Sequence, residues 1–238
     1  MADKDVPRRS FLKGAGAAGT LAATALAGGL PRAAEAQTAQ VQAADPAAEP
    51  LLTLSADEAA FLSAVYDTII PADKLSPSGT DCGCVTYIDR QLAGAWGNGA
   101  RMYRNGPYLP ARPEHGYQLP LTPREYFAAG IKAANAWAVK THGKTFDRLT
   151  PADRATALTA METGQAKFDT IDAQVFFEAL LQSAMEGFFA DPVYGGNRGK
   201  VSWRMVGYPG LPATYRHDIK TYLGKVYDKP PRSIADFS

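Results

Sequence analysis

The sequence has few of the residues that build metal and redox centres. Its 238 residues include only two cysteines and three histidines. Two cysteines exclude a framework of several disulfides, and they exclude a four-thiolate cluster built by this chain alone. The histidines (His115, His142 and His217) are widely spaced, so we expect no metal site in this chain.

An excess of charge of one sign is also missing. The 25 Lys and Arg residues against 24 Asp and Glu residues give a formal net charge of +1. This balance does not indicate a nucleic-acid partner. The apolar run at residues 14–30 is short and rich in Gly and Ala, so it does not suit a bilayer span. The hydrophobic content of 46% is that of a soluble globular protein.

Motifs that bind cofactors or carry out hydrolysis are absent from the sequence. There is no Gly-x-Gly-x-x-Gly after a strand, no Cys-x-x-Cys-His, and no Gly-x-Ser-x-Gly. Residues 191–200 are rich in glycine but lack the Walker spacing, and Val201 follows Lys200 where Ser or Thr is required. We therefore predict no cofactor and no catalytic residue in this chain.

The N-terminus has the layout of an export signal. Paired arginines precede an apolar run, and Ala34, Glu35 and Ala36 form a small-x-small cleavage site. The residues that mark it as the twin-arginine type are Arg8, Arg9, Phe11 and Leu12. We predict a signal peptide over 1–36 and a flexible linker over 37–50, which is rich in Ala, Gln, Pro and Glu.

This leader has a mechanistic consequence. The twin-arginine route carries folded proteins, often because they hold a cofactor inserted in the cytoplasm. Since no cofactor motif follows, one explanation is that the chain exports a cofactor-bearing partner that has no signal of its own.

The rest of the chain is predicted to be helical. Ser55 with Glu58 and Thr122 with Glu125 form capping boxes. Apolar residues at helical spacing predict helices between Ser55 and Pro71, over 84–96, from Thr122, from Thr150 and over 172–190. No stretch alternates with a period of two. The fold class is therefore all-α: a single irregular helical domain over 51–238 with long loops rich in Pro and Gly.

Two long irregular segments, 104–121 and 191–238, are rich in Pro, Gly and aromatic residues. Their aromatic content argues against disorder. Two hypotheses remain open for them: that they cover a partner protein, and that they cover the helices of this domain.

A resemblance to a known family is carried by the region from Glu186 to Gly210. The run from Asp191 to Asn197 reads Asp-Pro-Val-Tyr-Gly-Gly-Asn, and Trp203 and Gly-Tyr-Pro-Gly at 207–210 follow it. With weaker matches at 68–73, 87–89 and 118–122, the sequence resembles the gluconate 2-dehydrogenase subunit 3 family over about residues 52–212. These proteins are small subunits of membrane-associated bacterial sugar, polyol and sugar-acid dehydrogenases.

The resemblance implies a complex of three kinds of subunit. A large flavoprotein of the glucose-methanol-choline type oxidises the substrate at FAD, and a multi-haem cytochrome c passes electrons to the membrane. The small subunit holds no cofactor, and it supports the folding, stability and twin-arginine export of the flavoprotein. The resemblance also implies that the chain lies in the periplasm and that it contacts the inner membrane through the complex. From this we predict that the partner interface includes Asp191, Pro192, Tyr194, Gly195, Gly196, Asn197 and Trp203.

The cysteine pair has several possible states. Cys82 and Cys84 are one residue apart, so a bond between them would close a strained ring. Buried inert thiols and a bridge to another chain are the alternatives. In an oxidising compartment we predict an inter-subunit disulfide, made by Cys84 rather than Cys82 because Cys84 lies nearer to a helix.

Two other functions remain as alternatives. The first is a stand-alone periplasmic enzyme that uses the 191–200 loop. The second is a sugar-binding protein that uses the 104–121 loop.

Overall fold

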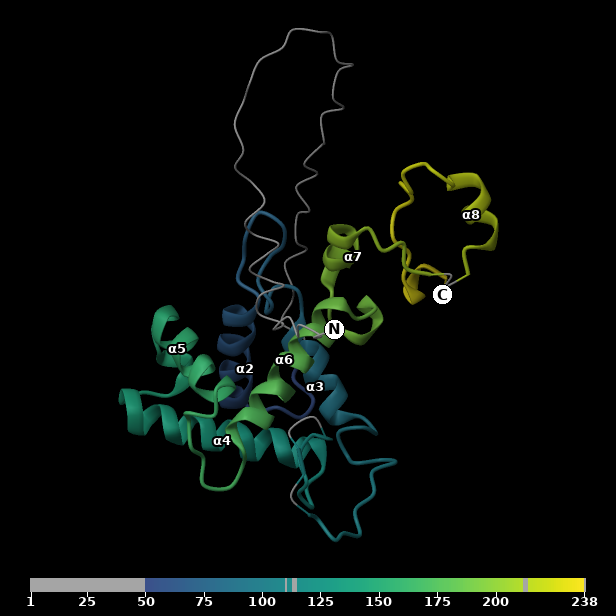
Figure 1. Cartoon of the computed structure of the whole chain (residues 1–238). Helices are drawn as coiled ribbons and strands as arrows, with labels where there is room; N and C mark the ends of the chain where they lie inside the picture. The colour runs from purple at the N-terminus through teal and green to yellow at the C-terminus, as the bar shows by residue number, and fades with distance from the viewer. Residues whose placement is uncertain (1–49, 110, 113–114, 212–213, 238) are drawn as a thin grey trace, which may run out of the picture. The chain divides into compact units, whose positions relative to one another are not determined.

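The computed structural model describes residues 50–109, 111–112, 115–211 and 214–237. In these ranges the α-helices are α2 (Ala56–Ile69), α3 (Cys84–Ala93), α4 (Pro123–His142), α5 (Pro151–Glu162), α6 (Ala173–Phe189), α7 (Val201–Val206) and α8 (Arg216–Tyr222), as drawn in Figure 1. Short 3-10 turns, η2 (Phe146–Arg148), η3 (Pro192–Tyr194), η4 (Arg198–Lys200) and η5 (Ile234–Phe237), join them. Within the described ranges no strand occurs, and the predicted all-α class is confirmed. The predicted export residues Arg8, Arg9, Phe11 and Leu12 lie outside these ranges, as does the linker up to residue 49.

The helices begin where the capping patterns place them. The Ser55 side chain accepts a hydrogen bond from the Glu58 N–H, and the Glu58 carboxylate accepts one from the Ser55 N–H at 2.8 Å. Thr122 and Glu125 form the same reciprocal pair at the start of α4. These bonds satisfy amide groups that have no partner inside the helix, so three residues of local sequence fix each start.

Helix α6 lies at the centre of the helical core. It packs against α2, α3, α4 and α5. Its buried face consists mainly of large apolar residues, including Phe176, Phe177, Leu180, Ala184 and Phe188. One polar link crosses the core, where the Tyr66 hydroxyl of α2 lies 2.8 Å from the Ser183 hydroxyl of α6. No helix in the described part of the chain has both the length and the apolar character needed to cross a bilayer.

The structure differs from the sequence prediction at the end of α3 and after α6. Helix α3 ends at Ala93, because the chain leaves the helical conformation at Gly94, and Trp96 packs edge-on against Phe127 from outside the helix. The segment after residue 190, predicted to be irregular, contains α7 and α8. These helices have six and seven residues, too few for helical periodicity to be recognised in sequence.

A buried carboxylate holds the start of the folded domain. Asp89 of α3 is 2% exposed and accepts hydrogen bonds from the backbone N–H groups of Leu52, Thr53 and Leu54 at 2.6 to 3.0 Å. The sequence suggested no partner for Asp89, because these amides precede it by 35 to 37 residues. Such bonds satisfy the charge that burial would otherwise destabilise.

Candidate partner interface

The end of α6 and the turn that follows it form the most distinctive part of the structure. Helix α6 stops at Phe189, and Asp191 then caps the 3-10 turn η3 by accepting a hydrogen bond from the Val193 N–H at 3.0 Å. Pro192 occupies the first position of η3, where its missing N–H costs nothing. Asp and Pro therefore begin this turn for the same reason that they begin helices.

Glycine is required at two successive positions of the turn. Gly195 ends η3 with a φ of 96°, a conformation that residues with a side chain rarely adopt. At Gly196 a Cβ atom would lie 2.0 Å from the carbonyl oxygen of Gly187. The backbone of the turn at Gly196 therefore packs directly against the backbone of α6 at Gly187.

Asn197 ties the turn to both neighbouring helices. Its side chain is fully buried, donates to the Ala190 carbonyl at 3.0 Å, and accepts from the Ser202 N–H at 3.0 Å and the Ser202 hydroxyl at 2.8 Å. Its own N–H donates to the Gly187 carbonyl at 2.9 Å. Every polar atom of this side chain is thus used in holding the end of α6 to the start of α7.

Trp203 belongs to the packing of the chain itself. It is 6% exposed, its indole N–H donates to the Phe189 carbonyl at 2.9 Å, and its ring meets Tyr208 edge-on at 5.1 Å. Trp203 thus fixes α7 on the end of α6. In the folded subunit a partner reaches the residues around Trp203 rather than its buried indole.

Around this buried framework, large apolar side chains are exposed. Tyr194 is 49% exposed and Val206 56%. We call the group the apolar face, and it consists of Met185, Phe189, Val193, Tyr194, Met205, Val206 and Tyr208. The elements that carry these residues are connected by packing, because α6 contacts α7, α7 contacts η4 and η4 contacts η3. A rigid turn surrounded by exposed apolar residues is typical of a protein-binding surface.

Of the residues predicted at a partner interface, only some are accessible. Tyr194 is exposed, whereas Asp191 and Pro192 are half-buried. The remaining four, Gly195, Gly196, Asn197 and Trp203, are buried. Most residues of the motif therefore build the turn, and the exposed apolar residues Met185, Phe189, Met205, Val206 and Tyr208 lie outside the motif. The interface itself stays a prediction.

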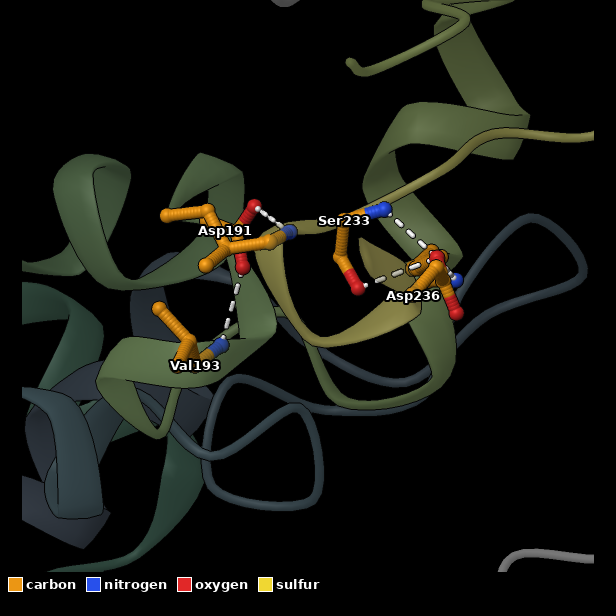
Figure 2. A network of polar contacts seen from close by, with 6 residues as sticks. Asp191, Val193, Ser233 and Asp236 are labelled. Carbon is orange, nitrogen blue, oxygen red and sulfur yellow. Dashed lines mark hydrogen bonds and ion pairs between the residues drawn. The ribbon is translucent and has the colours of Figure 1, made fainter. Parts of the chain in front are cut away.

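The C-terminal segment closes against the same turn, as Figure 2 shows. The second carboxylate oxygen of Asp191 accepts from the Ile234 N–H at 2.9 Å, and Lys200 forms an ion pair with Asp236. Asp236 also accepts from the N–H and the hydroxyl of the buried Ser233. We call this group of contacts over residues 232–237 the C-terminal clasp. Hydrogen bonding from the Lys200 ammonium and then the Ser233 amide lowers the pKa of Asp236 to about 2.

Both cysteines are buried free thiols. Cys82 is 1% exposed and Cys84 fully buried, and the Cys84 thiol lies 3.7 Å from the Ala184 carbonyl of α6. Burial raises the pKa of Cys82 to about 11 and that of Cys84 to about 12. A bridge to another chain would require Cys84 to leave the contact between α3 and α6. The burial therefore favours inert thiols, and the inter-subunit disulfide stays a prediction.

The loop suggested for a stand-alone enzyme uses its charged side chains in structural contacts. Arg198 donates to the Thr86 hydroxyl at 3.0 Å and, through its backbone N–H, to the Cys82 carbonyl at 3.0 Å. Lys200 is paired with Asp236, and Asp191 accepts from two backbone amides. Among the described residues, no cluster of three or more His, Cys, Asp or Glu residues is placed to hold a metal ion.

The loop suggested for sugar binding borders a cavity. Tyr117 stacks on Tyr126 with the ring centroids 3.9 Å apart. A cavity of about 220 Å³ lies beside this pair and is also lined by Gln118 and Asp172. Asp172 caps α6, whereas the buried hydroxyl of Tyr126, which also lines the cavity, has no hydrogen-bond partner among the described residues. No contact favours a sugar ligand over water at this place.

The described chain is thus a helical domain in which the 191–197 turn joins α6 to α7, and the elements next to the turn expose apolar residues. Comparison with known proteins agrees: the family model for gluconate 2-dehydrogenase subunit 3 matches residues 56–210, more than half of the chain. The chain belongs to the gluconate 2-dehydrogenase subunit 3 family, and it is accordingly an accessory subunit of a dehydrogenase complex. No curated protein and no solved structure matches it.

Proposed function

We propose that this chain is the non-catalytic small subunit of a periplasmic dehydrogenase complex that oxidises a sugar, a polyol or a sugar acid. Its partners are a flavoprotein of the glucose-methanol-choline type, which holds FAD, and a multi-haem cytochrome c, through which the complex contacts the inner membrane. The observation that carries this proposal is the family match, because it covers α2 to α7 and the whole 191–197 turn.

The proposed role of the chain is to fold with the flavoprotein and to export it. The apolar face supports the first part, since exposed Tyr194, Val206 and their neighbours would be covered by a partner. The leader supports the second part, because Arg8 and Arg9 stand in the pattern that the twin-arginine translocase reads. One leader would then serve two chains.

The experiment that tests this role replaces the paired arginines. In the native host, Arg8→Lys with Arg9→Lys is expected to leave both this chain and its flavoprotein in the cytoplasm. The measurement is flavoprotein content and dehydrogenase activity in periplasmic and cytoplasmic fractions. Arg32→Lys, a basic residue of the leader outside the motif, is the matched control and should leave export unchanged.

Two results would contradict the proposal. If active flavoprotein still reaches the periplasm when this chain does not, the flavoprotein has its own route. If the purified chain oxidises a sugar without any flavoprotein, the chain is an enzyme in its own right.

A further inference from the structure

The chain leaves the family-matched region at Gly210 and returns to the same place at Arg232. The Leu211 N–H donates to the Arg232 carbonyl at 2.7 Å, and the Arg232 N–H donates to the Pro209 carbonyl at 3.0 Å. Gly210 and Arg232 thereby form an isolated parallel bridge. Leu211 and residues 214–231, which include α8 (Figure 1), thus belong to a segment whose two ends are held together, and we call them the arm.

The interior of the arm is aromatic and polar. The Tyr227 ring meets Tyr215 at 6.3 Å and Tyr222 at 4.7 Å. Asp218 accepts hydrogen bonds from the Tyr227 hydroxyl at 2.8 Å and from the Lys229 ammonium at 2.7 Å. These contacts give the arm a small internal framework that uses all three of its tyrosines.

The exterior of the arm is aliphatic. Ile219 is 64% exposed, Leu223 81% and Val226 84%. Ile219 lies in α8, whereas Leu223 and Val226 lie in the loop that follows the last helical residue, Tyr222, and in which Gly224 has a φ of 71°. The arm therefore exposes aliphatic side chains to water while its three tyrosines are half-buried against one another, the reverse of what water alone would favour.

The aliphatic residues are accompanied by positive charge. The arm contains four basic residues, Arg216, Lys220, Lys225 and Lys229, against the two acidic residues Asp218 and Asp228. Lys229 is paired with Asp218, whereas Arg216, Lys220 and Lys225 are exposed and form no ion pair with another residue of the described ranges. A surface that complements the arm therefore has an apolar groove bordered by acidic side chains.

We propose that the arm docks into such a groove on the flavoprotein subunit, with Ile219, Leu223 and Val226 as its apolar contacts. The identity of the partner rests on the proposed function. A protein groove fits better than a lipid surface, because tyrosines that would lie at the lipid headgroups are instead half-buried in contacts with one another. Since the arm follows the family-matched residues 56–210, it adds a contact beyond the core that the family shares.

The test uses the full chain co-expressed with its flavoprotein and purified as the complex. Ile219→Ser with Leu223→Ser and Val226→Ser is expected to raise the dissociation constant about 100-fold, and Leu223→Ser alone about tenfold. The constant is read from a dilution series by mass photometry. Leu75→Ser, a matched control at an exposed leucine (71%), is expected to change it less than about threefold. Unfolding of the isolated chain checks that the triple variant remains folded.

A second variant tests the charge. Lys220→Glu with Lys225→Glu is expected to raise the dissociation constant about tenfold at low salt, with a smaller effect at high salt because salt screens exposed charges. A photo-crosslinking residue at position 223 should attach to the flavoprotein.

The outcomes separate the two proposals. If the wild-type chain does not bind the flavoprotein, both the proposed function and the docking of the arm are overturned. If the wild type and the triple variant bind it equally well, the arm proposal alone is overturned. Sedimentation with vesicles of phosphatidylglycerol and phosphatidylcholine tests whether the arm binds a lipid surface instead. The arm proposal is overturned if the triple variant loses vesicle binding but keeps flavoprotein binding.

Discussion

Asn197 shows how a single side chain sets the geometry of the candidate interface. It has a φ of 43°, a conformation that Asn tolerates better than most residues with a side chain. Its amide both donates and accepts, so it can satisfy a carbonyl at the end of α6 and an N–H at the start of α7 together. Neither Asp, which only accepts, nor Ala can do both.

The first prediction follows from these bonds. Asn197→Ala leaves the Ala190 carbonyl and the Ser202 N–H unpaired in a buried place, and it puts Ala at a positive φ. We expect the free energy of unfolding to fall by about 3 kcal/mol. Urea denaturation of the isolated chain measures it.

The control for this prediction is Asn105→Ala. Asn105 is exposed, so the same change of side chain should alter stability by less than about 0.5 kcal/mol. Equal effects at both positions would mean that the hydrogen bonds of Asn197 contribute little.

At the scale of elements, the C-terminal clasp connects the end of the chain to the turn after α6. Asp191 caps η3 with one carboxylate oxygen and holds the Ile234 N–H with the other. Asp236, which also accepts from Ser233 (Figure 2), forms an ion pair with Lys200. The clasp therefore depends on the carboxylates of Asp191 and Asp236. Because it begins at residue 232, it also holds the C-terminal end of the arm in place.

The second prediction is the pH dependence of the clasp. The pKa of Asp236 is about 2 in the folded chain, below the ordinary value of about 3.9 for an unfolded Asp. A lowered pKa stabilises the folded state fully above the unfolded value, and this contribution is lost as the pH falls through the folded value. Amide protection at residues 233–237 should thus be constant from about pH 5 to 8 and fall between about pH 4 and 2.

The matching variant removes the charge at neutral pH. Asp236→Asn should speed hydrogen–deuterium exchange at residues 233–237 at pH 7, while Asp228→Asn, an exposed residue of the arm, should not. Unchanged exchange in Asp236→Asn would show that the ion pair does not hold the clasp.

At the scale of the whole molecule, the chain combines a helical core with two exposed apolar surfaces, the apolar face and the arm. The core buries large side chains of α2, α3, α4, α5 and α6 against one another. The side chains of the two apolar surfaces, which include Tyr194, Val206 and Leu223, are instead exposed to solvent in the described chain. In a subunit of a dehydrogenase complex, surfaces of this kind are the expected contacts with other subunits.

The third prediction separates surface from core. Tyr194→Ser with Val206→Ser should weaken binding to the flavoprotein about tenfold or more, with less than about 1 kcal/mol lost from the stability of the isolated chain. Trp203→Ala should instead act on the core, lowering the free energy of unfolding of the isolated chain by about 3 kcal/mol because the indole is buried.

Binding assays of the complex and urea denaturation of the isolated chain provide the two readouts. Val139→Ser is the matched control, since Val139 of α4 is exposed to a similar extent (47%) and lies outside the apolar face. If Trp203→Ala weakens binding and leaves the stability of the isolated chain unchanged, then Trp203 contacts the partner directly.

The sequence alone determined those features that depend on a few neighbouring residues. Capping boxes placed the starts of α2 and α4, since each needs only a pair three residues apart. The run at 191–197 identified the family. It also located the turn, because Pro fixes φ at the start of a turn and Gly permits the positive φ at its end. The spacing of apolar residues likewise gave the all-α class and the long helix α6.

The tertiary structure decided which side chains face inward. The thiol of Cys84 meets a carbonyl 100 residues away, and Asp89 binds amides that precede it by 35 residues or more. Sequence reasoning treated Asn197 and Trp203 as interface residues, yet both are buried within the chain. Local sequence restricts only the backbone nearby, whereas burial depends on which distant elements pack together, so a motif locates a surface without revealing which of its residues are exposed.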